Sequence, residues 1–255
     1  MGIAQSGDFG GVSGPGVLFS FELPLIGTIN ITESVVIGFV LVVLISLFVI
    51  WLTHGMGKIP TKRQVVAEWI VETVNKLVKD NMGPSHLVYA PYIATIFVFS
   101  ITGSLVSLFG LRSMTADASV TIAWALICLV MITYTKLKYS GFGGYLKGFT
   151  EPIFVLTPMN IFSEVMTPVS MGLRHFGNVA GGMVITSLIY WALANLSAKL
   201  HLYFSVGELK IGVLQVGIPA VLSVYFDLFS GFMQAFIFVM LTMANVGNCI
   251  PDDKK

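Results

Sequence analysis

Charged residues are scarce in this chain of 255 residues, of which Asp, Glu, Lys and Arg together make up 11%. Ordinary soluble domains carry about 25%. The low charge and the 55% hydrophobic content exclude both a soluble globular domain and a disordered chain. Fourteen basic and thirteen acidic residues give a net charge of +1, so nothing favours nucleic-acid binding.

Cysteine is also scarce, because Cys128 and Cys249 are the only two and lie far apart in the sequence. This excludes a disulfide framework, and no His or Cys residues have the spacing of metal ligands. The sequence has no glycine-rich phosphate loop and no arrangement of Ser, His and Asp typical of a hydrolase. We therefore expect neither a metal nor another cofactor.

Long apolar runs fill the rest of the chain and predict an all-α polytopic membrane protein, with residues 1–255 forming one membrane domain. A β-barrel would instead alternate over segments of about ten residues. Five runs can cross a hydrocarbon core of about 30 Å, and the last two are much longer than one span needs. Neither has a clear polar loop near its middle, which favours a hairpin of two long, strongly tilted helices over 152–250. The five runs cover residues 33–54, 88–110, 117–137, 152–197 and 211–250.

Residues 61–80 have a different pattern, with apolar side chains at helical spacing on one face and charged side chains on the rest. Thr61 follows a proline and is the expected N-cap. We interpret this segment as an amphipathic helix on the lipid surface. A helix packed on a partner protein is the alternative.

Basic residues are distributed unevenly between the loops. The segment 1–32 has none, the loop 54–87 has five, the loop 111–116 has one and the loop 136–151 has three. Because cytoplasmic loops are enriched in Lys and Arg, this alternation predicts an extracytoplasmic N-terminus and a cytoplasmic C-terminus.

Four ionisable residues fall at or within the predicted spans, namely Asp117, Glu164, Arg174 and Asp227. Placing such a group at membrane depth costs about 2.5–3.5 kcal/mol on insertion scales, so each is a candidate functional residue.

Arg174 is the most informative of these, because a guanidinium cannot lose its charge by deprotonation. At helical spacing it shares one face with small or polar residues, and Gly177 and Gly181 make that face shallow enough for another helix to approach closely. The polar members of the face are Ser170 and Asn178.

Arg174 and His175 each have a less specific interpretation that stays open. Arg174 could form a structural salt bridge with Asp227 inside the bundle. His175 points about 100° away from Arg174 on a helix and could be an ordinary core histidine or a proton relay.

In the last run, Asp227, Gly231 and Gln234 share a face, and Asp227 could exchange a proton, hold a cation or pair with a neighbouring helix.

At these positions the chain resembles the a subunit of F-type ATP synthases. The resemblance rests on Pro-Val-Ser-Met-Gly-Leu-Arg-His-Phe-Gly-Asn at 168–178 and on Phe-Asp at 226–227 followed by Gln-Ala-Phe-Ile-Phe at 234–238. A shorter match is Thr-Ala-Asp-Ala-Ser-Val-Thr at 115–121. Order and spacing agree along nearly the whole chain.

The resemblance implies a stator subunit in the plasma membrane of a bacterium, held beside a rotating ring of c subunits with a peripheral-stalk b subunit as a further partner. Arg174 would face the ring's ion-binding carboxylate. Two offset half-channels would carry protons or sodium ions, so that their flow drives ATP synthesis. The residues implied as lining the half-channels or the ring-facing surface are Asn178, Asp227, Gln234, Asp117, Ser170 and Glu164.

The sequence departs from the family pattern at two positions. Many relatives carry an acidic residue or a histidine where this chain has Met183, and a glutamate where it has Asn160. Both departures remove a titratable group from the implied pathways, and the coupling ion stays open between proton and sodium. A stand-alone channel or secondary transporter with Arg174 and Asp227 as its gating pair is the alternative function.

Overall fold

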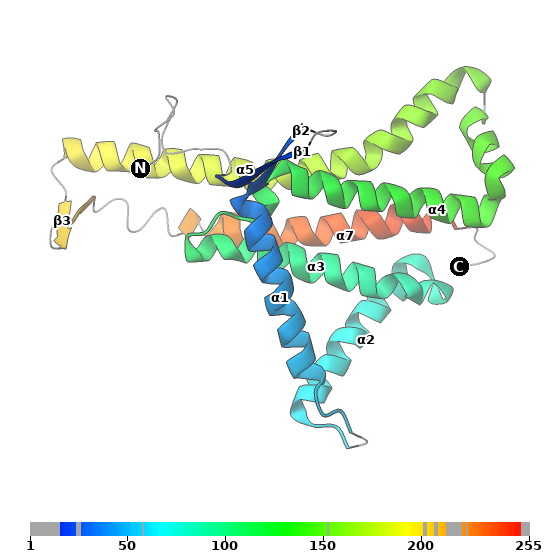
Figure 1. The fold of residues 1–255 in the computed structure, drawn as a ribbon, viewed down its shortest axis with the longest axis horizontal. Coiled ribbons are helices and arrows are strands. Elements are labelled where there is room, and N and C mark those ends of the chain that lie inside the picture. Colours follow the sequence, from blue (N-terminus) through cyan, green and yellow to red (C-terminus); the bar gives the residue numbers. More distant parts are fainter. Residues whose placement is uncertain are drawn as a thin grey trace.

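A computed structural model describes residues 16–23, 27–57, 59–151, 153–200, 203–206, 209–212, 221–222 and 224–250. Within these residues the chain is helical apart from two small hairpins and short connecting segments (Figure 1). Its long apolar helical stretches agree with the five predicted spans. They are Glu33–Thr53, Pro84–Phe109, Ala118–Thr150, Phe154–Lys199 and Val224–Gly247.

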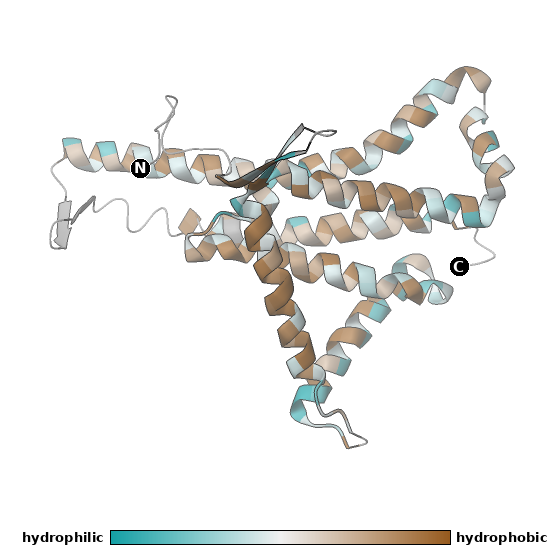
Figure 2. Ribbon diagram, viewed as in Figure 1, coloured by the Kyte–Doolittle hydropathy of each residue, from teal (hydrophilic) through white to brown (hydrophobic). Residues whose placement is uncertain are grey.

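The first hairpin lies in the segment 1–32, for which the loop charges predict a position outside the cytoplasm. Strand β1 (Val17–Leu23) pairs antiparallel with β2 (Gly27–Thr32), and residues 1–15 are outside the described part. These strands are not predicted from the sequence pattern. β2 continues directly into α1 (Glu33–Thr53), which Figure 2 shows as strongly hydrophobic along its length.

Helix α2 (Lys62–Met82) confirms the helix predicted over 61–80 and its N-cap, because the Thr61 hydroxyl accepts a hydrogen bond from the Gln64 amide at 3.4 Å. The apolar face of α2 has a buried half and an exposed half. Near the C-terminal end Val78 is fully buried in the bundle, whereas Trp69 nearer the N-terminus is 65% exposed. The exposed half is available for lipid or a partner.

Helix α3 (Ala90–Leu105) is preceded by the 3₁₀ turn η1 (Pro84–Tyr89) and followed by η2 (Val106–Phe109). After a short 3₁₀ turn, η3 (Met114–Ala116), the side chain of Asp117 caps α4 by accepting a hydrogen bond from the Ser119 amide at 3.0 Å.

Helix α4 (Ala118–Thr150) extends well beyond the run predicted over 117–137. It bends at Gly141, whose φ of +68° is a left-handed conformation that favours glycine. The 3₁₀ turn η4 (Phe154–Leu156) then leads into the next long helix.

Helix α5 (Thr157–Lys199) has 43 residues and continues through Pro168. At 1.5 Å per residue it is about 64 Å long, roughly twice the thickness of a hydrocarbon core. It packs along α4, and its C-terminal half extends beyond the other helices (Figure 1). One of the two predicted long helices is therefore present.

The second predicted long helix does not begin at residue 211. Strand β3 (Tyr203–Val206) pairs antiparallel with β4 (Leu209–Gly212), so that residues 211 and 212 belong to a strand. A two-residue connection between alternating segments favours a tight hairpin over a helix. Residues 213–220 are outside the described part, and the hairpin of two tilted helices stays a prediction.

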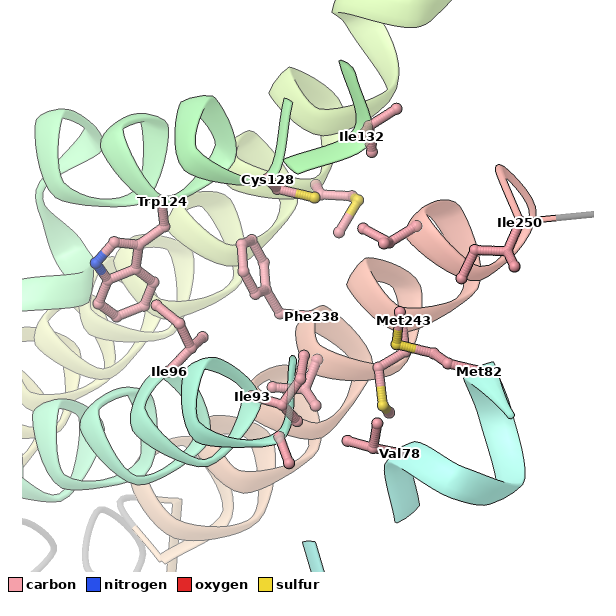
Figure 3. Packing of buried hydrophobic residues seen from close by; sticks show 14 of the residues in the cluster. Val78, Met82, Ile93, Ile96, Trp124, Cys128, Ile132, Phe238, Met243 and Ile250 are labelled. Atoms are coloured by element: carbon pink, nitrogen blue, oxygen red, sulfur yellow. The ribbon is translucent and has the colours of Figure 1, made fainter. Parts of the chain in front are cut away.

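The π-helical turn η5 (Val224–Ser230) precedes α7 (Gly231–Gly247). Helix α7 packs against α2, α3, α4 and α5, and the core gathers around it. Figure 3 shows Phe238 and Met243 of α7 surrounded by side chains from the other helices, including Ile93 and Trp124. Helix α5 contributes Met171 to this cluster.

Candidate functional site

One face of α5 is open to the outside of the chain. Ser170, Arg174 and Asn178 are all exposed on it, as their helical spacing predicts. A Cβ atom added at Gly177 or Gly181 would meet no other atom within 4 Å. The face therefore combines a permanent positive charge with a shallow surface that no other described part of the chain covers.

Arg174 makes no hydrogen bond and no ion pair with any residue that the structure describes. It lines two shallow hollows of about 480 and 450 Å³. The backbone of Asp227 lies in η5, but its side chain is outside the described part. The alternative of a salt bridge between Arg174 and Asp227 therefore stays open.

Asn178 and Gln234 are brought together from α5 and α7. The Asn178 amide donates to the side-chain carbonyl of Gln234 at 3.4 Å, and Gln234 is only 4% exposed. Nearby, Gly182 lets α5 approach η5 closely, because a Cβ there would lie 3.1 Å from the Phe226 ring. Two predicted site residues are thus neighbours at the edge of the open face.

His175 points into the bundle and is fully buried. Its ring packs edge-on against Trp124 and Phe238, with centroids 5.7 and 5.8 Å apart, and its Nε2 lies 3.3 Å from the Ser100 hydroxyl. The structure therefore places His175 away from the exposed face of Arg174, in a mainly aromatic environment.

For the stator function that the resemblance implies, we expect His175→Leu to retain most of the ATP-synthesis activity, because packing accounts for most of the contacts of this side chain. The measurement is ATP synthesis by the reconstituted complex. Ser100→Ala is the matched control, because it removes only the polar contact between the Ser100 hydroxyl and His175. A large loss of synthesis in a fully assembled His175→Leu complex would favour the proton-relay role instead.

Asp117 is 7% exposed and lies at the start of α4. Besides capping the helix, its carboxylate accepts a hydrogen bond from the Thr32 hydroxyl at 3.1 Å. Its described polar contacts thus tie β2 to α4, and none of them reaches α5. Its implied role in lining a half-channel or the ring-facing surface stays a prediction.

Glu164 lies in a cleft of about 510 Å³ between α4, α5 and the end of α7. Its carboxylate pairs with the Lys136 ammonium at 2.7 Å and accepts a hydrogen bond from the Tyr145 hydroxyl at 3.1 Å. Cys249 lines the same cleft, and burial raises the pKa of its thiol. Glu164 is a site residue predicted from the sequence, whereas Lys136 stands out there only as a loop charge.

Asn160, one of the two departures from the family pattern, also lines this cleft. Its amide donates to the backbone carbonyls of Phe149 and Glu151 at 2.8 and 3.2 Å. In this chain the position therefore joins the start of α5 to the end of α4, a role that an ionised glutamate could not fill because it has no donor.

The cleft at Glu164 adjoins one of the hollows beside Arg174. The two share Ser163, Thr167 and Asn245 as lining residues. The two adjoining hollows therefore run along α5 from Glu164 to Arg174, and their lining mixes hydroxyl and amide groups with apolar side chains such as Met166 and Leu241.

The chain matches the family model described as ATP synthase A chain over residues 35–246. A relative from Propionigenium modestum named "ATP synthase subunit a, sodium ion specific" is 32% identical over 230 residues, which cover 84% of this chain and 72% of the relative. The ATP synthase subunit a of Anoxybacillus flavithermus is 31% identical over 245 residues, covering 92% and 95%. That of Listeria monocytogenes serovar 1/2a is 29% identical over 246 residues, covering 91% and 98%.

The family model starts inside the first apolar helical stretch and ends inside the last, and it includes every site residue predicted from the sequence. The relatives match at nearly full length rather than over one motif. The chain therefore belongs to the ATP synthase A chain family, and its function is that of the stator subunit that couples ion flow to rotation in the membrane sector of an F-type ATP synthase.

Proposed function

We propose that Arg174 is the fixed cation of this stator and faces the ion-binding carboxylate of the c-ring. The observation that carries the proposal is the open face of α5, where Arg174 is exposed beside glycines that nothing in the described chain covers. A permanent charge competes for the carboxylate and releases its ion, and it also blocks the direct path between the half-channels.

The path from Glu164 to Arg174 is the proposed inner half-channel. It is supported by the two adjoining hollows and by the loop charges, which favour a cytoplasmic connection between α4 and α5. Polar groups and water along such a path replace part of the hydration shell of a moving cation.

The outer half-channel is proposed to involve Asp117 and Asp227, with Asn178 and Gln234 at the ring-facing edge. The carboxylates supply negative charge, and the amide pair supplies hydrogen-bonding groups next to Arg174. Ser170 completes the ring-facing surface.

The coupling ion of this chain is proton or sodium. The name of the Propionigenium relative specifies sodium, whereas the names of the Anoxybacillus and Listeria relatives give no ion. We further propose that the protein resides in a bacterial plasma membrane, with its N-terminus outside, its C-terminus in the cytoplasm, α2 on the lipid surface and a b subunit as partner. A stand-alone channel is not favoured, because the match to the family extends over residues 35–246.

Disulfide crosslinking tests the proposed orientation of α5. We expect Asn178→Cys to crosslink to a cysteine placed beside the ion-binding carboxylate of a c subunit. Val165→Cys is the matched control, because Val165 is 40% exposed but points about 180° away from Arg174 on the helix. Crosslinking of Val165→Cys alone would show that another face meets the ring.

A further inference from the structure

The Glu164 carboxylate has both oxygens engaged by groups of this chain. The Lys136 ammonium lies 2.7 Å from Oε2, and the Tyr145 hydroxyl donates to Oε1 at 3.1 Å. The Glu164 side chain is only 8% exposed, whereas that of Lys136 is 35% exposed. The acidic group is thus fixed inside the cleft, while its basic partner reaches toward solvent.

A cation that enters this cleft meets a neutral ion pair. It gains a carboxylate ligand only if it displaces the Lys136 ammonium, because both charges compete for the same oxygen. The cleft offers further oxygen ligands suited to a hard cation. They come from Ser140, Ser163, Thr167, Asn245 and Asn248.

The Lys136 ammonium already has a second neighbour while it is paired with Glu164, and it can keep this neighbour when it leaves the carboxylate. The Phe149 ring centroid lies 6.0 Å from the Lys136 nitrogen, within the range of a cation–π contact. The flexible four-carbon stem of lysine allows this exchange without movement of α4.

We propose that Glu164 is a binding site for a monovalent cation in the inner half-channel and that Lys136 is a tethered competitor for that site. The inference rests on the proposed function, since it assigns a regulatory group to the same path. Lys136 keeps Glu164 neutralised when cation is scarce at the inner mouth, and it yields the carboxylate when cation is abundant.

The test is passive cation conduction by the reconstituted membrane sector, stripped of its catalytic sector, under an imposed potential. The cation concentration on the cytoplasmic side is varied in two series. In the first series sodium is varied at constant pH, and in the second the pH is varied without sodium. The series in which the conduction of wild type changes identifies the ion. Lys136→Met should lower the half-saturating concentration by up to about fivefold, the factor expected for loss of a partly exposed ion pair. Lys136→Arg keeps the competing charge and should not lower it.

Two further variants make the test specific to the pair. Glu164→Gln should raise the half-saturating concentration, and adding Lys136→Met to it should produce no further change. Lys147→Met is the matched control, because Lys147 pairs with Glu151 at 3.4 Å on the same side of the chain but both side chains are exposed, at 74% and 64%.

An unchanged half-saturating concentration in Lys136→Met would overturn the inference, as would an equal decrease in the Glu164→Gln background. Either result leaves the proposed function intact as long as coupled synthesis still requires Arg174. Failure of the proposed function would appear separately, as synthesis that is insensitive to Arg174→Ala.

Discussion

Replacing Arg174 by alanine is expected to abolish ion-driven ATP synthesis. The side chain is exposed on the open face of α5 and pairs with no described residue, so its removal takes away a charge without breaking a contact within the described chain. A cation at membrane depth is costly unless it meets an opposite charge, and the proposed function supplies that charge from the c-ring. The measurement is ATP synthesis by the reconstituted complex under an imposed proton gradient, with and without sodium.

Arg174→Lys serves as the charge-conserving control. We expect it to fail or nearly fail, because an ammonium is compact and strongly hydrated and can lose its proton where water is scarce. Normal synthesis with lysine would show that charge alone suffices. Wild-type synthesis by Arg174→Ala would mean that Arg174 is structural, and the dependence of wild type on sodium would still identify the coupling ion.

The sequence was sufficient to predict this face because helical periodicity depends on local spacing. Ser170, Arg174 and Asn178 recur every four residues, and a continuous helix necessarily places them on one side. The same reasoning predicted α2 and its N-cap at Thr61, since a cap requires only residues within one turn.

The inner cleft could not be predicted in this way. Lys136 and Glu164 are 28 residues apart, and they meet only because α4 bends at Gly141 and α5 returns along it. The contact of Asn178 with Gln234 likewise depends on the packing of two helices whose side-chain pattern gives no register between them. The β3–β4 hairpin did have a local signal, namely alternating residues around Gly207-Glu208, which the overall hydrophobicity obscured.

The glycines of α5 give the second large prediction, because glycine inside a helix is unfavourable by about 1 kcal/mol and requires an explanation. The chain itself explains Gly172, where a Cβ would lie 2.7 Å from the Thr121 carbonyl oxygen and 3.0 Å from the Cβ of Ala125. It does not explain Gly177, whose added Cβ would meet nothing within 4 Å.

We expect Gly172→Val to destabilise the chain by about 1–3 kcal/mol or more, because the obstructing atom belongs to the backbone of α4 and cannot move aside. The measurement is the temperature at which the purified complex loses this subunit, together with the amount of subunit recovered from membranes. A variant that assembles with unchanged thermal stability would contradict the close packing of α4 and α5.

Gly177→Leu is expected to have the opposite effect, with normal recovery and thermal stability but loss of ATP synthesis. Leucine is a better helix former than glycine and has free space within this chain, so a merely intramolecular role would leave the variant stable and active. Small residues at helix interfaces permit close approach of another helix. If the c-ring passes over this face, the added leucine side chain therefore obstructs the ring. Full synthesis by Gly177→Leu would therefore exclude close contact between the ring and this part of α5, whereas selective loss of synthesis would establish that the open face exists for a moving partner.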